Sequence, residues 1–472
     1  MLGLFGTLDM GARSLSVTQE QMAVTGQNLA NANNPTYSNQ TLNVTTSTPL
    51  ETPIGEEGTG VVGTSITSAS DPYINSQIQA QNSVTSSLTA QQTGLQNAEA
   101  YLDEEISSTS STGTPDSPNG LSTSLTSLFN SFSAMQYDPN SPSLQQSAVQ
   151  SAEDLANQFQ QVSSQLSGVR NTLNDSIQSD VTTANQDLTT IASLNKQIVI
   201  AESSGGTAND LVDQREAALE DLSNKVNITT TTNADGSINV SIGNKAMVTD
   251  VSQTDSLGTY DASGNGQLML QANSASGTAL NITGGSIEGS ITARDGALSD
   301  LQTGLNTLAS QLITNVNSIY STGYDANGDT GQDLFTGTDA SDIAVNSSLV
   351  ADPSLFQYSG SSTPGSTDSS TVLALSELAT QNISGLSNQT FSDNYDDTVT
   401  NLGSAISSVN NQLSTSQSVG AMLTNQRDTT AGVSLDDQMT NLIQYQKAYE
   451  ASAELVTTVN EMLETLVSMK TE

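Results

Sequence analysis

The last stretch of the chain, from Ser434 to Glu472, carries one apolar stripe that neither Gly nor Pro interrupts. Apolar residues recur every seven positions, and others follow three or four positions later, which is the pattern of a long amphipathic helix. Ser434, with Asp437 in the first turn, is a suitable helix cap. At ~1.5 Å per residue the helix would be about 55 Å long. Such a stripe either packs on the chain's own globular domain or forms a coiled-coil arm that packs on the N-terminus and on neighbouring copies.

Residues 1–31 repeat the seven-residue spacing and predict a second amphipathic helix. The Asn-rich segment from Asn28 to Gln40, which contains Pro35, ends that helix, and on physical grounds alone it is an ordinary helix stop. Residues 41–66 alternate weakly and predict extended chain or short strands. The residues of the two stripes that we expect at an assembly interface are Leu8, Leu15, Met22, Leu29, Leu435, Met439, Leu442, Tyr449, Val456, Val459, Leu463 and Leu466.

The region between the two ends is mostly helical in its spacing, with one β-rich interruption. Apolar residues that advance in steps of three and four predict helices from residue 71 to about 106 and over 121–135, 143–201, 209–226, 291–320, 371–380 and 391–428. Asn209 or Asp210 is the expected cap of the fourth of these. Residues 226–291 alternate in short runs, and Asp235-Gly236 between two of them predicts a hairpin. Short strands are also predicted at 342–345 and 355–358.

Helices at both ends and β-rich sequence in the middle predict a nested layout of mainly α class with a β-rich insertion. Residues 1–65 and 430–472 would form a terminal coiled-coil domain of long antiparallel helices. Residues 66–225 and 291–429 would form a discontinuous helical rod. Residues 226–290, either alone or together with 323–368, would form a small outer β-rich domain that protrudes at the far end.

Composition excludes several classes of function. The net charge is −39, from 49 acidic and 10 basic residues, so few side chains could neutralise nucleic-acid phosphates or an anionic membrane surface. The absence of both His and Cys removes Ser-His and Cys-His catalysis and nearly all zinc sites, and we expect no cofactor. No run approaches the ~18 apolar residues of a membrane span, and the N-terminus lacks the pattern of a cleavable secretory signal.

Two acidic clusters are candidate sites. The Asp325–Asp329 segment resembles a calcium loop, but Thr330 and Thr336 stand where that loop needs Gly and Glu, so a Gly/Asp-rich turn is favoured. Asp103, Glu104 and Glu105 lie together at a predicted helix end, where a solvated run is favoured. Carboxylate-pair hydrolysis of a sugar is the remaining enzymatic alternative, although a chain without Trp can hardly furnish a sugar-stacking cleft.

Both ends of the chain resemble the flagellar axial protein family of rod, hook and hook-associated proteins. The Asn-rich segment 28–40 is similar to that family's N-terminal motif, and residues 432–468 are similar to its terminal helix. The middle is similar to the members that form the junction between hook and filament, at residues 193–198, 209–244, 289–296 and 324–335. Residues 41–140 and 337–390 match weakly.

The resemblance implies a non-enzymatic structural subunit that self-assembles in a ring through its terminal helices. Its implied partners are the hook protein, a second junction protein and an export chaperone at the C-terminal helix, with no nucleic acid and no membrane. It implies an extracellular location in the bacterial flagellum, reached through the type III export channel without signal cleavage. The alternatives are a hook or rod subunit and, outside the flagellum, a coiled-coil surface or adhesive protein.

Overall fold

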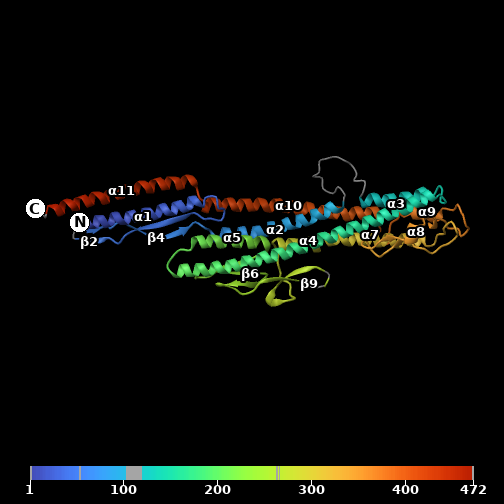
Figure 1. Cartoon of the computed structure of the whole chain (residues 1–472), viewed down its shortest axis with the longest axis horizontal. Coiled ribbons are helices and arrows are strands. Elements are labelled where there is room, and N and C mark those ends of the chain that lie inside the picture. Colours follow the sequence, from blue (N-terminus) through green and yellow to red (C-terminus); the bar gives the residue numbers. More distant parts are fainter. Residues whose placement is uncertain (1–2, 53–54, 103–119, 262–263, 265, 470–472) are drawn as a thin grey trace.

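The computed structural model describes residues 3–52, 55–102, 120–261, 264 and 266–469 of an elongated molecule (Figure 1). Helix α1 (Leu4–Ala30) and helix α11 (Leu435–Ser468) lie side by side at one end, and both chain termini point the same way. A two-stranded antiparallel ribbon of β1 (Gln40–Thr46) and β4 (Val61–Ser68) contacts α1, and β2 (Leu50–Thr52) pairs with β3 (Gly55–Glu57) between them. The predicted antiparallel pairing of the terminal helices is thus confirmed.

The rod consists of long helices that bury one face each. Its helices are α2 (Pro72–Leu102), α3 (Leu121–Met135), α4 (Pro142–Ser203), α5 (Asn209–Lys225), α6 (Ser286–Asp295), α7 (Ala297–Tyr320) and α10 (Phe391–Ala431). Proline is favourable at the first position of α4, where its missing N–H leaves no bond unmade. Beyond it, apolar residues at steps of three and four keep α4 unbroken over 62 residues. The first core joins the early part of α4 to α2, α3, α7 and α10.

A second core joins the late part of α4 and α5 to the β-rich insertion. Its strands are β5 (Thr229–Thr232), β6 (Ile238–Ile242), β7 (Lys245–Thr249) and β8 (Ser252–Gln253), antiparallel in that order, and the separate pair β9 (Leu257–Asp261) and β10 (Leu268–Ala272). Alternate residues of β6 are buried. The predicted hairpin around Asp235-Gly236 is confirmed. The tighter two-residue turn is Gly243-Asn244, where both φ angles are positive (53° and 65°), as such hairpin turns require.

The insertion lies against the side of α4, so the expectation that the middle protrudes at the far end is wrong (Figure 1). The far end instead holds α3, α8 (Ser347–Ala351) and α9 (Ser370–Glu377). Buried side chains of residues 334–358, such as Phe335 and Tyr358, belong to the first core. The structure therefore separates this segment from the β-rich insertion, because its apolar residues pack on the rod helices.

Two local expectations are also corrected. The single helix predicted over 291–320 is two helices, α6 and α7. They break at Gly296, whose φ of −92° and ψ of −115° interrupt the helix. The adjacent Arg294 is fully buried and forms a bidentate ion pair with Asp295 (2.7 Å for each contact). The strand predicted at 355–358 is absent. Of the two strands proposed for that region only β12 (Ala344–Val345) forms, and it pairs with β11 (Phe335–Thr336).

Candidate assembly interface

Small residues bring the backbones of α1 and α11 close together. Gly11 of α1 is buried, and a β-carbon there would lie only 2.7 Å from Cγ2 of Val456. The hydroxyls of Ser14 and Ser452 are hydrogen-bonded at 2.9 Å. Ser434 caps α11 as predicted, its hydroxyl accepting from the amide of Asp437 at 3.4 Å. The terminal helices therefore pack as a close antiparallel pair within one chain.

The structure divides the predicted interface residues into two groups. Val459 is buried, and a half-buried group packs in the terminal region: Leu8, Leu15, Met22, Leu29, Leu442, Val456 and Leu463. Exposed residues form the other group, with 52% of Leu435, 48% of Met439, 38% of Tyr449 and 58% of Leu466 open to solvent. One partner helix covers only part of so broad a stripe.

Further apolar side chains of the terminal helices are exposed, and we call the whole exposed set the terminal face. It comprises Phe5 of α1, then Leu435, Met439, Ile443, Tyr449, Leu455, Met462, Leu466 and Val467 of α11, and Met469 directly after α11. Ile443, Leu455 and Met462 were missed from the sequence because they stand outside the principal seven-residue row. The interval of seven between Leu455 and Met462 was the available signal. Exposed apolar side chains that gather in a patch are typical of protein–protein contact sites, so the terminal face is the candidate assembly surface.

The Asn-rich segment is more than a helix stop, because it forms a buried polar joint where α1 ends and α11 begins. The side chain of Asn28 donates to the carbonyl of Gln40 (2.8 Å) and to Gln438 Oε1 (3.1 Å). Its oxygen accepts from the hydroxyl of Tyr37 (2.9 Å) and the amide of Gln40 (3.0 Å). Gln438 in turn donates to Asn39 Oδ1 at 3.3 Å. These residues, the Asn28 joint, fix the register of α1 against α11.

Replacing Asn28 with Ala is expected to destabilise the terminal pair by about 3–5 kcal/mol, because several buried polar partners lose a hydrogen bond that costs ~1–3 kcal/mol each when left unmade. Urea dependence of amide exchange at Tyr37 and its neighbours in the isolated chain measures the loss. Asn33→Ala, at an exposed position of the same segment, is the matched control. Equal midpoints for the two variants would contradict a joint role for Asn28.

One face of α5 connects the terminal pair to the rod. Asp210 accepts from Gln27 (3.2 Å) and Gln40 (2.7 Å), and Asp213 accepts from the amide of Ser38 (3.0 Å). Further along, Glu216 accepts from Gln79 of α2 at 3.1 Å. The expected capping role of Asn209 or Asp210 is therefore wrong. Ala208 precedes the helix without a side-chain cap, and Asn209 instead donates to the carbonyl of Ile66 at 3.0 Å.

Burial perturbs the acids of this face. Desolvation raises the pKa of Asp213 to about 6, although its bonds to Ser38 oppose the rise, and it raises the pKa of Glu216 to about 7, against the opposing effect of Arg215. The pKa of Glu220 is also raised by burial, although the Arg427 guanidinium, paired with it, favours its ionised form. Desolvation and the nearby Asp210 raise the pKa of Tyr37 to about 12.

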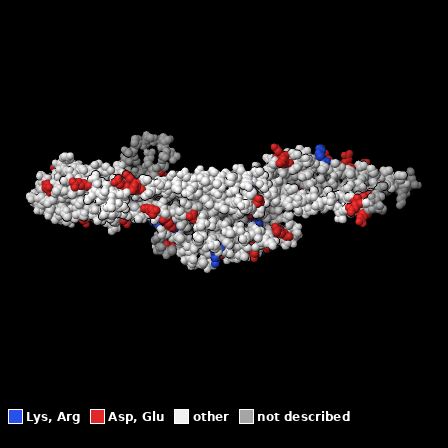
Figure 2. All heavy atoms as spheres, turned by 180° about the vertical axis from the view of Figure 1, so that it is seen from behind, with Lys and Arg blue, Asp and Glu red and all other residues white. Residues whose placement is uncertain are grey.

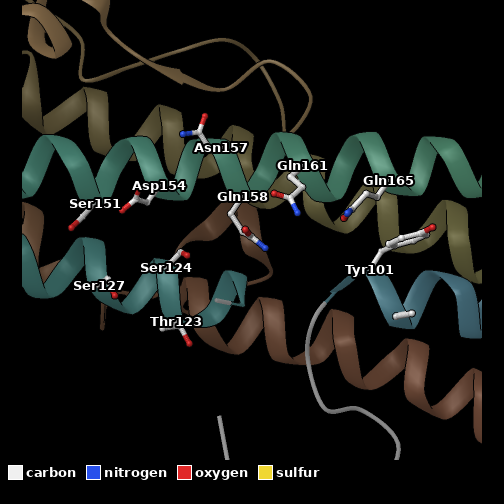
Figure 3. Close-up of a pocket in the computed structure, with 11 residues that line it drawn as sticks. Tyr101, Thr123, Ser124, Ser127, Ser151, Asp154, Asn157, Gln158, Gln161 and Gln165 are labelled. Carbon is white, nitrogen blue, oxygen red and sulfur yellow. The ribbon is translucent and has the colours of Figure 1, made fainter. Parts of the chain in front are cut away.

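Two surface features bear on the enzymatic and calcium-site alternatives. A groove of about 600 Å³ between α3 and α4 is lined mainly by uncharged polar side chains, such as Ser124 and Gln158 (Figure 3). Of the described residues that line it, Asp154 is the one that carries a carboxylate, and hydrolysis by paired acids needs two. In the calcium-like loop the Asp325 carboxylate accepts the amides of Asn327 and Asp329, both at 2.8 Å. The Asp103–Glu105 cluster lies outside the described residues.

The described part of the chain offers neither a metal-binding cluster nor a membrane-spanning helix. Among those residues, no group of three or more acidic, His or Cys side chains is placed to hold a metal ion. None of the helices there has the length and apolarity to cross a membrane. Figure 2 shows acidic side chains scattered over one face, with few basic ones between them.

Two stretches of the sequence match models of known protein families. The family model described as the flagellar hook-associated protein FlgK helical domain matches residues 109–335. A model described as the flagellar basal body rod FlgEFG protein C-terminal region matches residues 425–469, which include all of α11.

Relatives that match nearly the whole chain carry names from the same group of flagellar proteins. The flagellar hook-associated protein 1 of Bacillus subtilis (strain 168) is 27% identical over 514 residues, 99% of each chain. That of Escherichia coli (strain K12) is 22% identical over 97% of this chain and 98% of its own. The flagellar hook junction protein FlgK of Burkholderia pseudomallei has a similar fold, with a TM-score of 0.62 at 17% identity over 75% of this chain and 100% of its own.

The paired terminal helices, the helical rod and these matches together define a structural protein of the flagellar axis. Within that class, the chain is similar over nearly its whole length to flagellar hook-associated protein 1. The resemblance found in the sequence is confirmed.

Proposed function

We propose that this chain is the structural subunit that joins hook to filament in a bacterial flagellum, and that it assembles into a ring through its terminal face. The observation that carries the proposal is the row of exposed apolar side chains on α11, beside a helix pair that already packs within the chain. Burying a large apolar side chain contributes ~1.5–3 kcal/mol, so contacts between neighbouring copies through this row would be strong. The matching of relatives named for the hook-associated protein along nearly the whole chain supports the same role.

The finer assignments follow from this role. The partners are the hook protein and a second junction protein, with an export chaperone on the C-terminal helix before assembly. The subunit lies in the extracellular part of the flagellum and is not an enzyme. Residues 1–65 and 430–472 act as the assembly domain, and residues 66–225 with 291–429 act as the rod that carries the β-rich insertion.

Deleting the gene is expected to give cells that build hooks but lack filaments, because the filament subunits then have no junction to which they can attach at the end of the hook. Electron microscopy of the cells tests this, and an immunoblot of the medium should detect shed filament protein. A plasmid-borne copy serves as the control and should restore filaments. Cells without hooks would identify a rod or hook subunit instead, and normal filaments would remove the flagellar junction role.

A further inference from the structure

We propose that α5 forms a proton-sensitive latch, in which protonation of Asp213 and Glu216 secures the terminal pair and α2 on the rod and their ionisation loosens both. The latch goes beyond the proposed function, since it concerns how the terminal domain is held rather than what it joins. Its residues are Asp210, Asp213, Glu216 and Glu220, which follow one another at intervals of three, three and four and therefore share one face of the helix.

The four members of the latch together contact three different parts of the chain. Asp210 and Asp213 hold the segment that follows α1, through Gln40 and the amide of Ser38. Glu216 holds α2 through Gln79. Glu220 holds α10 through Arg427. Four carboxylates on one helix face thus connect three separate parts of the chain.

Charge balance along this face is poor. Arg427 is paired with Glu220, and α10 also contributes Asp428 to the lining of the same cavity. The Arg215 side chain, from α5 itself, donates to Asn195 Oδ1 (3.0 Å) and to the carbonyl of Gly236 (2.7 Å). The N-terminal segment contributes Tyr37, and α2 contributes the neutral Gln79. Like charges at neighbouring positions of one helix repel, so ionising every member is unfavourable.

The latch leaves little room for water that could screen the repulsion between the carboxylates. The cavity lined by Asp213, Glu216, Glu220 and Arg427 has a volume of about 20 Å³, which is room for about one water molecule. Opening the latch would expose the carboxylates to bulk solvent and favour their ionised forms. The pKa values of about 6 for Asp213 and about 7 for Glu216 place the response in the range of neutral and mildly acidic pH.

The sign of the effect follows from linkage. Because the folded pKa of each acid lies above its unfolded value, the closed latch binds more protons than the open chain. Its stabilisation is complete below the unfolded pKa values and is lost as the pH rises through about 6 to 7. The terminal domain is therefore held firmly at pH 5.5 and loosely at pH 8.

Spin labels on introduced cysteines test the latch in the full chain. The sequence has no Cys, so Gln19→Cys on α1 and Thr190→Cys on α4, both at exposed positions, give a single label pair. The distance distribution between the labels should be narrow at pH 5.5 and markedly broader at pH 8. In the Asp213→Asn and Glu216→Gln double variant, whose amides cannot ionise, it should stay the same at both pH values.

Asp175→Asn on the exposed surface of α4 is the matched control and should respond to pH like the parent. Glu216→Gln alone keeps the Ser38 contact, so it should fold and lose part of the response. A parent distribution of equal width at both pH values would overturn the proposal. So would a full pH response in folded Glu216→Gln or in the double variant.

Discussion

Cells whose chain ends before Ser452 are expected to build hooks but no filaments and to release unpolymerised filament protein into the medium. The truncation removes Val456, which packs on Gly11, and the buried Val459, so the first half of α1 loses its partner. It also removes the terminal face beyond that point, including Leu466. Each fully buried apolar side chain contributes ~1.5–3 kcal/mol, and the loss recurs in every subunit of a ring. Electron microscopy of sheared appendages and an immunoblot of the supernatant measure both effects.

A truncation after Met469 is the control for this experiment, because it leaves the whole of α11 in place. It should give normal filaments. Normal filaments on the chain that ends before Ser452 would show that the second half of α11 is dispensable and would remove the junction role from the paired terminal helices. Missing hooks would move the subunit to the hook or the rod.

Replacing Leu466 with Asp is expected to abolish incorporation into the flagellum while leaving the melting temperature of the isolated chain unchanged. The side chain is 58% exposed in the single chain, so the charge there stays in water. Buried against a neighbouring copy, the same carboxylate would have to be desolvated at a cost of several kcal/mol. Leu442→Asp and Leu463→Asp should also block assembly, but these half-buried positions should lower the melting temperature as well.

Leu373→Asp provides the matched control, since it introduces the same change at an exposed position of α9, at the opposite end of the molecule. It should be incorporated normally. Flagella that contain the Leu466→Asp chain in normal amounts would place the contact between copies elsewhere.

The sequence predicted well the elements that depend on a single periodic pattern. The spacing of apolar residues gave α3 its correct bounds, and it gave α4 to within two residues at each end. It failed at the break between α6 and α7, because the apolar positions of the two helices continue in phase across Gly296. Only the backbone angles at that glycine and the burial of Arg294 distinguish two helices from one.

The sequence predicted the two apolar stripes of the terminal helices, but not which of their residues are covered within the chain and which are open. Periodicity marks Val456 and Leu466 equally, whereas the structure packs the first on α1 and leaves the second exposed. The Asn28 joint was read as a helix stop because Asn is common at helix ends. Its partner Gln438 lies 410 positions away, and no local pattern reveals a hydrogen bond of that kind.

The pairing of α1 with α11 has a consequence for timing. Ser14 and Ser452 are 438 positions apart. The apolar faces of α1 and α11 therefore stay exposed until both ends of the chain are present and can pack together. Contacts so distant in sequence form late, because the whole intervening chain must be arranged before they close. In a chain that emerges N-terminus first, α4 and the helices around it would fold first, and α1 and α11 would pair last. The subunit would then form its terminal face only after its last residues have emerged.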